Sequence, residues 1–332
     1  MKRFLKTSLK YTLYTIVVLI ALAAVVPFLI PVKPLDGLAP ARTLATEDSR
    51  FVTIPFAGTD GLDIHYFDQA AIEPDENRVF VLMHGSVFNA NTWDEVIDGL
   101  SQYGRVVAYD QIPYGLSEKP LSGTWSEDNP YTSEAAISQL FSFLDTLGLE
   151  HVVLVGNSYG STLAVRAALA QPERITAMIL GDPAVYVQES MPAWLMSLPQ
   201  TKRMGPLLAR TIGASEGFIR QTYLDAELIS EERMRATLVH TGVQNWDAAL
   251  WEYLSVWKTP DLSGDFAAIS QPVLVLTGAQ DAIVPVSDSR KLDVVLPYSS
   301  LAILPACGHV PQEECPDAYL TAVSTWLGQI GE

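Results

Sequence analysis

A serine flanked by glycines lies where a short apolar run ends and a helical segment begins. Few folds contain this arrangement. Residues 156–160 read Gly-Asn-Ser-Tyr-Gly, directly after Val-Val-Leu-Val and directly before Ser-Thr-Leu-Ala-Val-Arg-Ala-Ala-Leu-Ala. A sharp strand-to-helix turn needs glycines where the backbone crowds, and it projects the central side chain at the start of the helix. The bare pattern arises by chance in loops, but strand, turn and helix together predict that Ser158 is a catalytic nucleophile.

Short apolar runs alternate with helical segments on both sides of this turn. The runs lie at 79–83, 106–108, 152–155, 175–180 and 273–276. Because they are β-branched and apolar on both faces, they predict strands buried under helices, in an α/β fold with a doubly wound, mostly parallel sheet. Two earlier segments, 51–56 and 62–67, predict an antiparallel hairpin at the edge of that sheet.

The alternation stops between residues 184 and 264, where a long helical pattern contains four of the seven tryptophans. We interpret this segment as a helical cap inserted into the sheet domain, with aromatic residues that form its own core and, as a group, line an acyl pocket. The predicted divisions are a basic tail at 1–10, a transmembrane anchor at 11–32, a linker at 33–50, the sheet domain at 51–183 and 265–332, and the cap at 184–264.

The amino-terminal segment contains no charged residue from 11 to 32, which is long enough for a helix to cross a bilayer. Lys2, Arg3, Lys6 and Lys10 precede it. By the positive-inside rule, we expect an uncleaved single-pass anchor in the lipid bilayer, with a cytoplasmic amino terminus and the catalytic domain on the other side. The alternative is a cleaved signal peptide and a secreted protein, but no small-residue cleavage site directly follows the run.

Charge and motif content exclude several classes of partner. The formal net charge is −17, so the chain should repel the phosphates of nucleic acid. No clustered histidine, cysteine or acid spacing suggests a metal, and no glycine-rich loop after a first strand suggests a nucleotide. We therefore expect neither a metal nor an organic cofactor.

A serine nucleophile needs a general base and an acid that orients it. The histidines are His65, His84, His151, His240 and His309. Only His309 follows a predicted strand late in the chain, as the order serine, acid, histidine requires. Asp281 follows the strand at 273–276 and is the expected acid. Its competitor, Asp182, is expected to cap or brace the beginning of the cap instead.

The oxyanion of acyl transfer needs backbone N–H donors. One is expected from Tyr159, the residue after the nucleophile, and the other from the loop after the strand at 79–83. In that loop we select the amide of Ser86, with Val87 as the next candidate, and expect His84 to fix the loop structurally.

Two cysteines, Cys307 and Cys315, lie on either side of His309. In an exported domain they can form a disulfide that staples the histidine loop. Spacing alone does not establish the geometry, so two small buried thiols are the favoured interpretation.

From 51 to 330 the chain resembles the α/β-hydrolase superfamily. The resemblance rests on His-Gly at 84–85, Trp93, and the segments at 105–120, 156–160, 278–285 and 308–316. It implies that Asp110 is a structural aspartate and that the triad is Ser158, Asp281 and His309. A serine nucleophile is unlike the aspartate of epoxide hydrolases and haloalkane dehalogenases.

The predicted function is therefore hydrolysis of a carboxylic ester, or a related acyl bond, of a neutral apolar small molecule through an acyl-enzyme on Ser158. One alternative is a carbon–carbon-bond hydrolase or an aminopeptidase-like amidase of the same fold. Loop 86–91 lacks the glycine-rich segment that carbon–carbon hydrolases of the superfamily often carry, and Ser161 replaces the usual second glycine after the nucleophile turn. An alternative from another class is a non-catalytic, membrane-tethered binding protein, because fold alone does not fix function.

Overall fold

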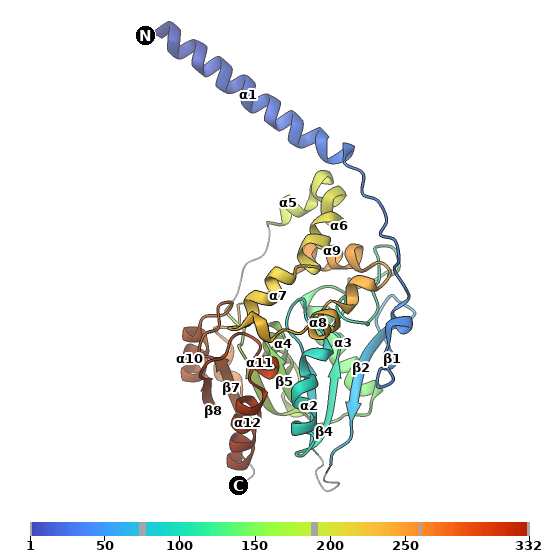
Figure 1. Ribbon diagram of the computed structural model, residues 1–332, viewed down its shortest axis with the longest axis vertical. Helices are drawn as coiled ribbons and strands as arrows, with labels where there is room; N and C mark the ends of the chain where they lie inside the picture. The colour runs from blue at the N-terminus through green and yellow to red at the C-terminus, as the bar shows by residue number, and fades with distance from the viewer. Residues whose placement is uncertain (1, 73–77, 187–191, 259–260, 331–332) are drawn as a thin grey trace.

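A single twisted sheet forms the centre of the molecule. The computed structural model describes residues 2–72, 78–186, 192–258 and 261–330 (Figure 1). Within these residues the strand order is β1-β2-β4-β3-β5-β6-β7-β8. The strands are β1 (Arg50–Ile54), β2 (Leu62–Gln69), β3 (Val79–Met83), β4 (Arg105–Tyr109), β5 (Val152–Asn157), β6 (Ile175–Gly181), β7 (Val273–Gly278) and β8 (Ser299–Leu304).

The pairing of the strands confirms the predicted fold class. β1 pairs antiparallel with β2, and β2 pairs antiparallel with β4, so the first two strands form a hairpin at one edge. The other neighbouring strands are all parallel. Parallel strands end at the same edge of the sheet, so the turns after β3, β5, β7 and β8 lie at the same end of the molecule.

Helices cover both faces of the sheet because side chains alternate along each buried strand. On β3, Phe80 and Leu82 belong to one apolar cluster, whereas Val81 and Met83 belong to the other. The first cluster includes residues of α2 and α12, and the second includes residues of α3, α4 and α10. These helices are α2 (Asp94–Leu100), α3 (Ser133–Thr146), α4 (Tyr159–Ala170), α10 (Val286–Val295) and α12 (Pro316–Ile330).

The chain between β6 and β7 folds into helices that lie over the end of the sheet where these turns meet (Figure 1). We call these helices the cap. They are α5 (Ala193–Ser197), α6 (Pro199–Gly213), α7 (Glu216–Thr222), α8 (Glu231–Thr237) and α9 (Trp246–Val256).

The cap has an aromatic core of its own, where α6 packs on α9. Trp246 and Trp251 are buried there. Glycines on α6 permit the close approach, because a Cβ at Gly205 would collide with the Trp251 ring and one at Gly213 with the Trp246 ring. These two tryptophans therefore belong to the cap's own core, as expected for a part of its aromatic residues.

The amino-terminal helix α1 (Lys2–Leu29) projects away from the body beyond the cap (Figure 1). Its stretch Lys10–Leu29 is long and apolar enough to cross a membrane, and none of it is buried in the protein. Membrane anchors and signal sequences share this property. The predicted linker is hydrogen-bonded to the cap. The Ala39 N–H donates to the Gly242 carbonyl and the Gln244 N–H donates to the Ala39 carbonyl, both at 2.9 Å.

Candidate active site

Ser158 occupies a strained turn between β5 and α4. Its backbone has φ 54° and ψ −117°, a conformation that residues with a side chain rarely adopt. Both flanking glycines are required by space: a Cβ at Gly156 would collide with the backbone at Gly160 and Ser161, and a Cβ at Gly160 would collide with the Met83 carbonyl. The turn therefore has the geometry expected from the sequence.

Ser161, the departure from the superfamily pattern, has a defined structural part in this turn. Its hydroxyl is buried and donates to the carbonyl of Gly156 at 2.9 Å, with the carbonyl of Gly181 3.1 Å away. The backbone N–H of Ser158 also donates to Gly181, at 2.8 Å. Serine at this position thus ties the turn to β6.

His309 and Asp281 form a buried pair on the loops after β8 and β7. The His309 Nδ1 lies 2.8 Å from Asp281 Oδ2, and both side chains are almost fully buried. The other carboxylate oxygen accepts N–H bonds from Ile283 at 2.7 Å and Val284 at 3.0 Å. Burial alone would raise the pKa of Asp281, but the His309 contact and these amides lower it below the ordinary value.

The backbone of His309 connects this pair to the serine turn and to the cap. Its carbonyl accepts a 3.1 Å hydrogen bond from the side chain of Asn157, the residue before Ser158. Its N–H donates to the carbonyl of Thr222 in α7 at 2.7 Å. The structure therefore holds the candidate base against the nucleophile turn on one side and the cap on the other.

Asp182 lies beside this pair but has other partners. Its Oδ1 accepts hydrogen bonds from the Thr277 hydroxyl at 3.0 Å and the Gly278 N–H at 2.9 Å. A carboxylate oxygen of Asp182, a carboxylate oxygen of Asp281 and a ring nitrogen of His309 lie within 4.8 Å of one another. Burial and the neighbouring Asp281 charge raise the pKa of Asp182 well above its ordinary value. Asp182 thus braces the end of β7, which leads to Asp281, rather than the cap.

The loop after β3 has the shape expected of an oxyanion loop. Its turn is closed by a 3.2 Å hydrogen bond from the Phe88 N–H to the Gly85 carbonyl, with Val87 at φ 64°. The backbone of Val87 hydrogen-bonds the Tyr114 phenol. The Ser86 amide stays the candidate donor from this loop, beside the amide of Tyr159, which begins α4.

His84 fixes this loop, as predicted from its position in the sequence. Its Nδ1 donates to the Gly85 carbonyl at 2.7 Å, and its Nε2 accepts from the Gln111 N–H at 3.0 Å. Burial lowers the pKa of His84, which keeps the imidazole neutral with one donor and one acceptor.

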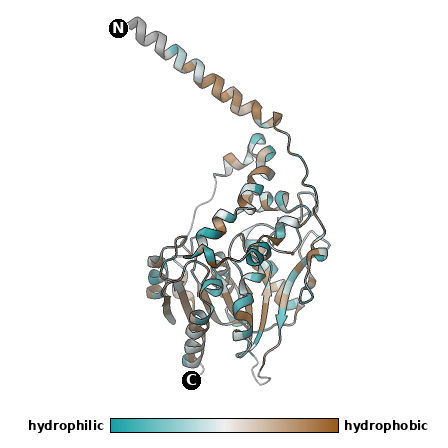
Figure 2. Ribbon diagram, viewed as in Figure 1, coloured by the Kyte–Doolittle hydropathy of each residue, from teal (hydrophilic) through white to brown (hydrophobic). Residues whose placement is uncertain are grey.

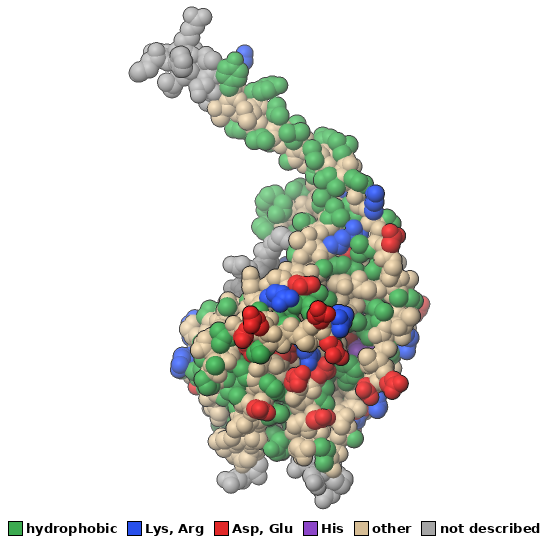
Figure 3. All heavy atoms as spheres, in the orientation of Figure 1, with side chains coloured by type: hydrophobic (Ala, Val, Ile, Leu, Met, Phe, Trp, Pro, Cys, Tyr) green, Lys and Arg blue, Asp and Glu red, His purple; other side chains and the backbone are tan. Residues whose placement is uncertain are grey.

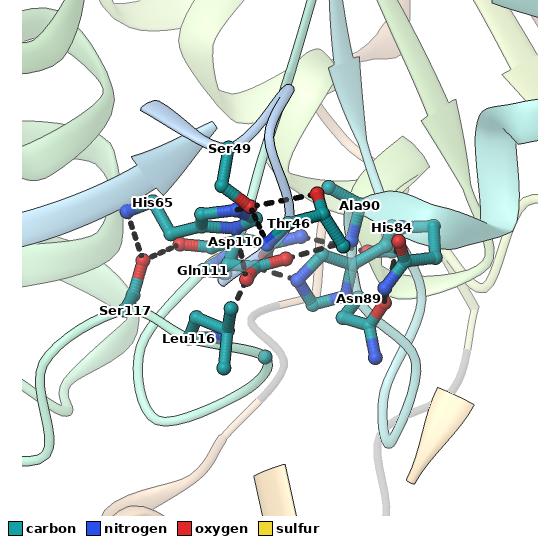
Figure 4. A network of polar contacts seen from close by, with 12 residues as sticks. Thr46, Ser49, His65, His84, Asn89, Ala90, Asp110, Gln111, Leu116 and Ser117 are labelled. Atoms are coloured by element: carbon teal, nitrogen blue, oxygen red, sulfur yellow. Dashed lines mark hydrogen bonds and ion pairs between the residues drawn. The ribbon is translucent and has the colours of Figure 1, made fainter. Parts of the chain in front are cut away.

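Asp110 is the centre of a second network that supports the same loop (Figure 4). It accepts N–H bonds from Ala90 at 2.7 Å and Leu116 at 2.6 Å, and it pairs with His65 Nδ1 at 2.7 Å. The sequence pattern places His65 only in an edge strand and gives no sign of this pair. The signal needed to find it is the register of β2 on β4, which sets His65 beside the end of β4.

Cys307 and Cys315 form a disulfide, which contradicts the favoured prediction of two thiols. The short helix α11 (Pro311–Glu314) turns the chain back, so that the Cα atoms lie 6.2 Å apart, within the range that a disulfide spans. The loop that carries His309 is therefore closed covalently.

Two acids on α11, the buried Glu313 and the half-buried Glu314, fasten this loop to the cap, and the sequence pattern does not reveal them. Glu313 accepts hydrogen bonds from Thr92 of the core and Tyr223 of the cap, and burial raises its pKa. Glu314 accepts N–H bonds from Gly308 at 2.6 Å and Asp225 at 2.8 Å. The acid run at 313–314 gives no signal, because its partners come from distant segments.

A small cavity of about 20 Å³ lies beside Tyr159, the residue that follows Ser158, and neither Ser158 nor His309 lines it. Tyr159, Tyr114 and Tyr253 line it, and among the described residues no charged side chain contributes to its wall. Tyr253 comes from α9, so the cap supplies part of that wall. The remaining lining residues are Ile64, Tyr109, Gln111, Ile112, Pro130, Tyr131, Thr132, Ala136, Gln139, Phe143 and Leu163.

Comparison with known proteins adds a family and several relatives. A family model described as alpha/beta hydrolase fold matches residues 78–316. A 2-hydroxy-6-oxononadienedioate/2-hydroxy-6-oxononatrienedioate hydrolase of Paraburkholderia phymatum is 29% identical over 85% of this chain and 96% of its own. A 2-hydroxymuconate semialdehyde hydrolase of Pseudomonas putida is 28% identical over 69% of this chain and 79% of its own.

Solved structures with a similar fold include two of lower identity. A thermophilic esterase from Thermogutta terrifontis has a TM-score of 0.67 at 22% identity, covering 85% of this chain and 99% of its own. A membrane phospholipase A, a bacterial virulence factor, has a TM-score of 0.66 at 22% identity and matches over 100% of both chains. At this identity the likeness shows the fold alone.

Proposed function

The chain belongs to the α/β-hydrolase fold family and is a hydrolase of small molecules, and from that premise we propose that it cleaves carboxylic esters of neutral, apolar substrates. The observation that carries this proposal is the strained turn that holds Ser158, with the uncharged aromatic side chains of Tyr159, Tyr114 and Tyr253 around a small cavity beside it. The buried His309–Asp281 pair on the neighbouring loops supports covalent catalysis by that serine.

In the proposed mechanism, Ser158 Oγ attacks the ester carbonyl while neutral His309 takes the hydroxyl proton at Nε2. Asp281 keeps the other ring N–H in place and offsets the imidazolium charge. The amides of Tyr159 and Ser86 donate to the oxyanion. The tetrahedral intermediate collapses as His309 returns the proton to the leaving alcohol. Water, activated in the same way by His309, then releases the carboxylic acid from the acyl-enzyme.

The charges of the cap favour a neutral substrate. Arg210 pairs with Asp247 at 2.7 Å, and Arg233 contacts Glu95 at 3.0 Å and approaches Glu313. These two arginines are already paired and offer little free positive charge to a carboxylate or phosphate group. Each acyl methylene buried against the aromatic wall should contribute about 0.8 kcal/mol.

Carbon–carbon-bond hydrolysis is the second candidate, and the names of the relatives favour it over ester cleavage. The relatives from Paraburkholderia phymatum and Pseudomonas putida are named as hydrolases of 2-hydroxy-6-oxo dienedioates and 2-hydroxymuconate semialdehyde. The same three residues can serve that reaction through a ketone carbonyl. The two candidate functions differ in the charge of the substrate, because a dienedioate carries two carboxylates whereas a neutral ester carries none.

The decisive experiment labels the full-length protein with a fluorophosphonate probe and measures turnover of defined substrates. Ser158→Ala should abolish labelling, whereas Ser138→Ala, an exposed serine on α3, should leave it unchanged. Persistent labelling of Ser158→Ala would refute the nucleophile, and an unlabelled wild-type protein would favour a binding protein.

The same preparation then tests the substrate class. We expect kcat/KM to be highest within a p-nitrophenyl ester series from acetate to laurate. A 2-hydroxy-6-oxo dienedioate and proline β-naphthylamide serve as comparators. Faster turnover of the dienedioate would establish the carbon–carbon hydrolase, and faster turnover of the naphthylamide the amidase.

We also propose that α1 is an uncleaved membrane anchor through residues 11–32, with the catalytic domain on the non-cytoplasmic side. The absence of charge from this span and the bases before it support the orientation. In this arrangement the cap, residues 184–264, lies between the bilayer and the sheet domain formed by 51–183 and 265–332. A mature amino terminus after the apolar run would favour a cleaved signal peptide.

A further inference from the structure

The part of the cap nearest to α1 exposes an unusual pair of large apolar side chains. We call α5 together with the first turn of α6 the cap tip, residues 193–203. Trp194 is 68% exposed and Leu198 is 37% exposed. The other described tryptophans are buried or half-buried. Large apolar side chains that are exposed next to one another can mark a surface that contacts a partner or a membrane.

The cap tip lies against the end of the apolar helix (Figures 1 and 2). The Gln200 side chain donates to the carbonyl of Ala24 at 3.3 Å, and the Arg203 guanidinium donates to the carbonyl of Ile30 at 3.3 Å. The apolar stretch ends at Leu29. Ala24 lies five residues inside that end, or about 7 Å along a helix. If α1 spans a bilayer, the cap tip therefore meets the boundary between headgroups and acyl chains.

The side chains at the cap tip suit that boundary. Tryptophan concentrates at membrane interfaces, where its ring is apolar and its N–H remains hydrated. Lys202 and Arg203 are exposed in the same turn and can meet lipid phosphates. Figure 3 shows green apolar side chains continuing from α1 onto the neighbouring surface of the cap. Apolar and basic side chains on one short segment are typical of an interfacial membrane contact.

We infer that the cap tip is a second membrane contact, which inserts Trp194 and Leu198 into the bilayer interface beside α1. This inference rests on the proposed anchor and deepens the proposed ester hydrolysis, because it names the substrate class as esters dissolved in lipid. α6 continues from the cap tip into the packing with α9, and α9 supplies Tyr253 to the cavity wall. The segment that touches lipid is thus joined through packed helices to the cavity.

The first test measures membrane depth without using activity. The full-length protein is reconstituted in phosphatidylcholine vesicles that carry bromine at defined positions along the acyl chain. Shallow bromines should quench tryptophan fluorescence strongly, and Trp194→Phe should remove most of that quenching. Trp125→Phe, a half-buried tryptophan outside the cap, is the matched control and should retain it. Equal quenching in wild-type protein and Trp194→Phe would overturn the inference.

The second test compares two substrates in the double variant Trp194→Asp/Leu198→Asp. Turnover of a long-chain ester dissolved in vesicles should fall about fivefold or more, because charge disfavours insertion. Turnover of water-soluble p-nitrophenyl acetate should not change. Val294→Asp, at an 82% exposed position on α10, is the control and should affect neither substrate. Equal losses on both substrates, or no loss on either, would overturn the inference.

The two tests separate this inference from the proposed function. If the wild-type protein turns over no ester, the proposed function fails, and the quenching by brominated lipid still decides the membrane contact. If esters are hydrolysed and Trp194 is not quenched, only the membrane contact fails.

Discussion

The same substitution at two neighbouring aspartates should have different consequences, because Asp281 pairs with His309 whereas Asp182 pairs with Thr277 and Gly278. Asp281→Asn replaces a carboxylate whose Oδ2 lies 2.8 Å from His309 Nδ1. The other oxygen of Asp281 is committed to two backbone amides, of Ile283 and Val284. An asparagine that preserves those two bonds must turn its NH2 group toward His309. The imidazole then accepts at Nδ1 and carries its proton on the nitrogen that should act as the base.

This wrong tautomer determines how much activity the Asp281→Asn variant should lose. Loss of the orienting carboxylate in a serine hydrolase triad lowers kcat by about 10⁴-fold, or roughly 5 kcal/mol of transition-state stabilisation. For Asp182→Asn the expected change is less than about threefold. The asparagine in that variant keeps an oxygen that accepts the hydrogen bonds from Thr277 and Gly278.

The assay is steady-state kinetics of p-nitrophenyl acetate hydrolysis at pH 8, measured for both variants. Circular dichroism verifies that each variant is folded. A folded Asp182→Asn variant that loses activity by orders of magnitude would refute the assignment, as would an active Asp281→Asn variant. Asp182→Ala serves as the harsher control. It leaves two buried donors unpaired and should destabilise the fold by about 1–3 kcal/mol for each.

The pH dependence of stability gives an independent readout of Asp182. Because burial and Asp281 raise its pKa in the folded state, folded protein retains a proton that the unfolded chain loses above the ordinary value. Its contribution to stability is complete below the unfolded pKa and declines as the pH rises through the folded pKa. The free energy of unfolding of Asp182→Asn should therefore decline less with rising pH than that of the wild type.

Three further predictions concern stability and topology. Replacing Cys307 and Cys315 by serine opens a loop with a sequence separation of 8. This should lower the free energy of unfolding by about 2–3 kcal/mol in urea titration; an unchanged midpoint would contradict it. Burial lowers the pKa of Lys119 to about 7, so stability should rise with pH from neutrality toward the ordinary lysine value of 10.5, and Lys119→Met should flatten that rise. If residues 11–32 are an anchor, the protein should stay in the membrane fraction after an alkaline wash, and release into the supernatant would argue against the anchor.

Periodicity and order along the chain were enough to predict the fold and the pairing of Asp281 with His309. Strand runs with apolar residues on both faces predict a parallel sheet, and parallel strands gather their carboxyl ends at one edge. Residues near these strand ends can therefore be predicted to be neighbours without any knowledge of side-chain contacts. This is why Asp281 could be chosen to partner His309 from position alone.

Partnerships that depend on register or on loop shape could not be predicted in this way. His65 meets Asp110 only because β2 pairs antiparallel with β4 in one register. The disulfide depends on how α11 turns the chain after His309, which spacing does not specify. Glu313 looks like an ordinary surface acid in the sequence, yet its carboxylate is enclosed between Thr92 and Tyr223. In each case the missing information is a contact between segments far apart in the chain.

The loop that carries His309 is bonded to both the core and the cap. The disulfide and the Asn157 hydrogen bond hold it to the core, whereas its N–H bond to Thr222 holds it to α7. Glu314 bridges both sides, since it accepts from Gly308 in the loop and from Asp225 in the cap. Any movement of the cap away from the sheet must break or stretch these bonds. The position of His309 is therefore coupled to that of the cap, and a cap held on a bilayer would hold the candidate base with it.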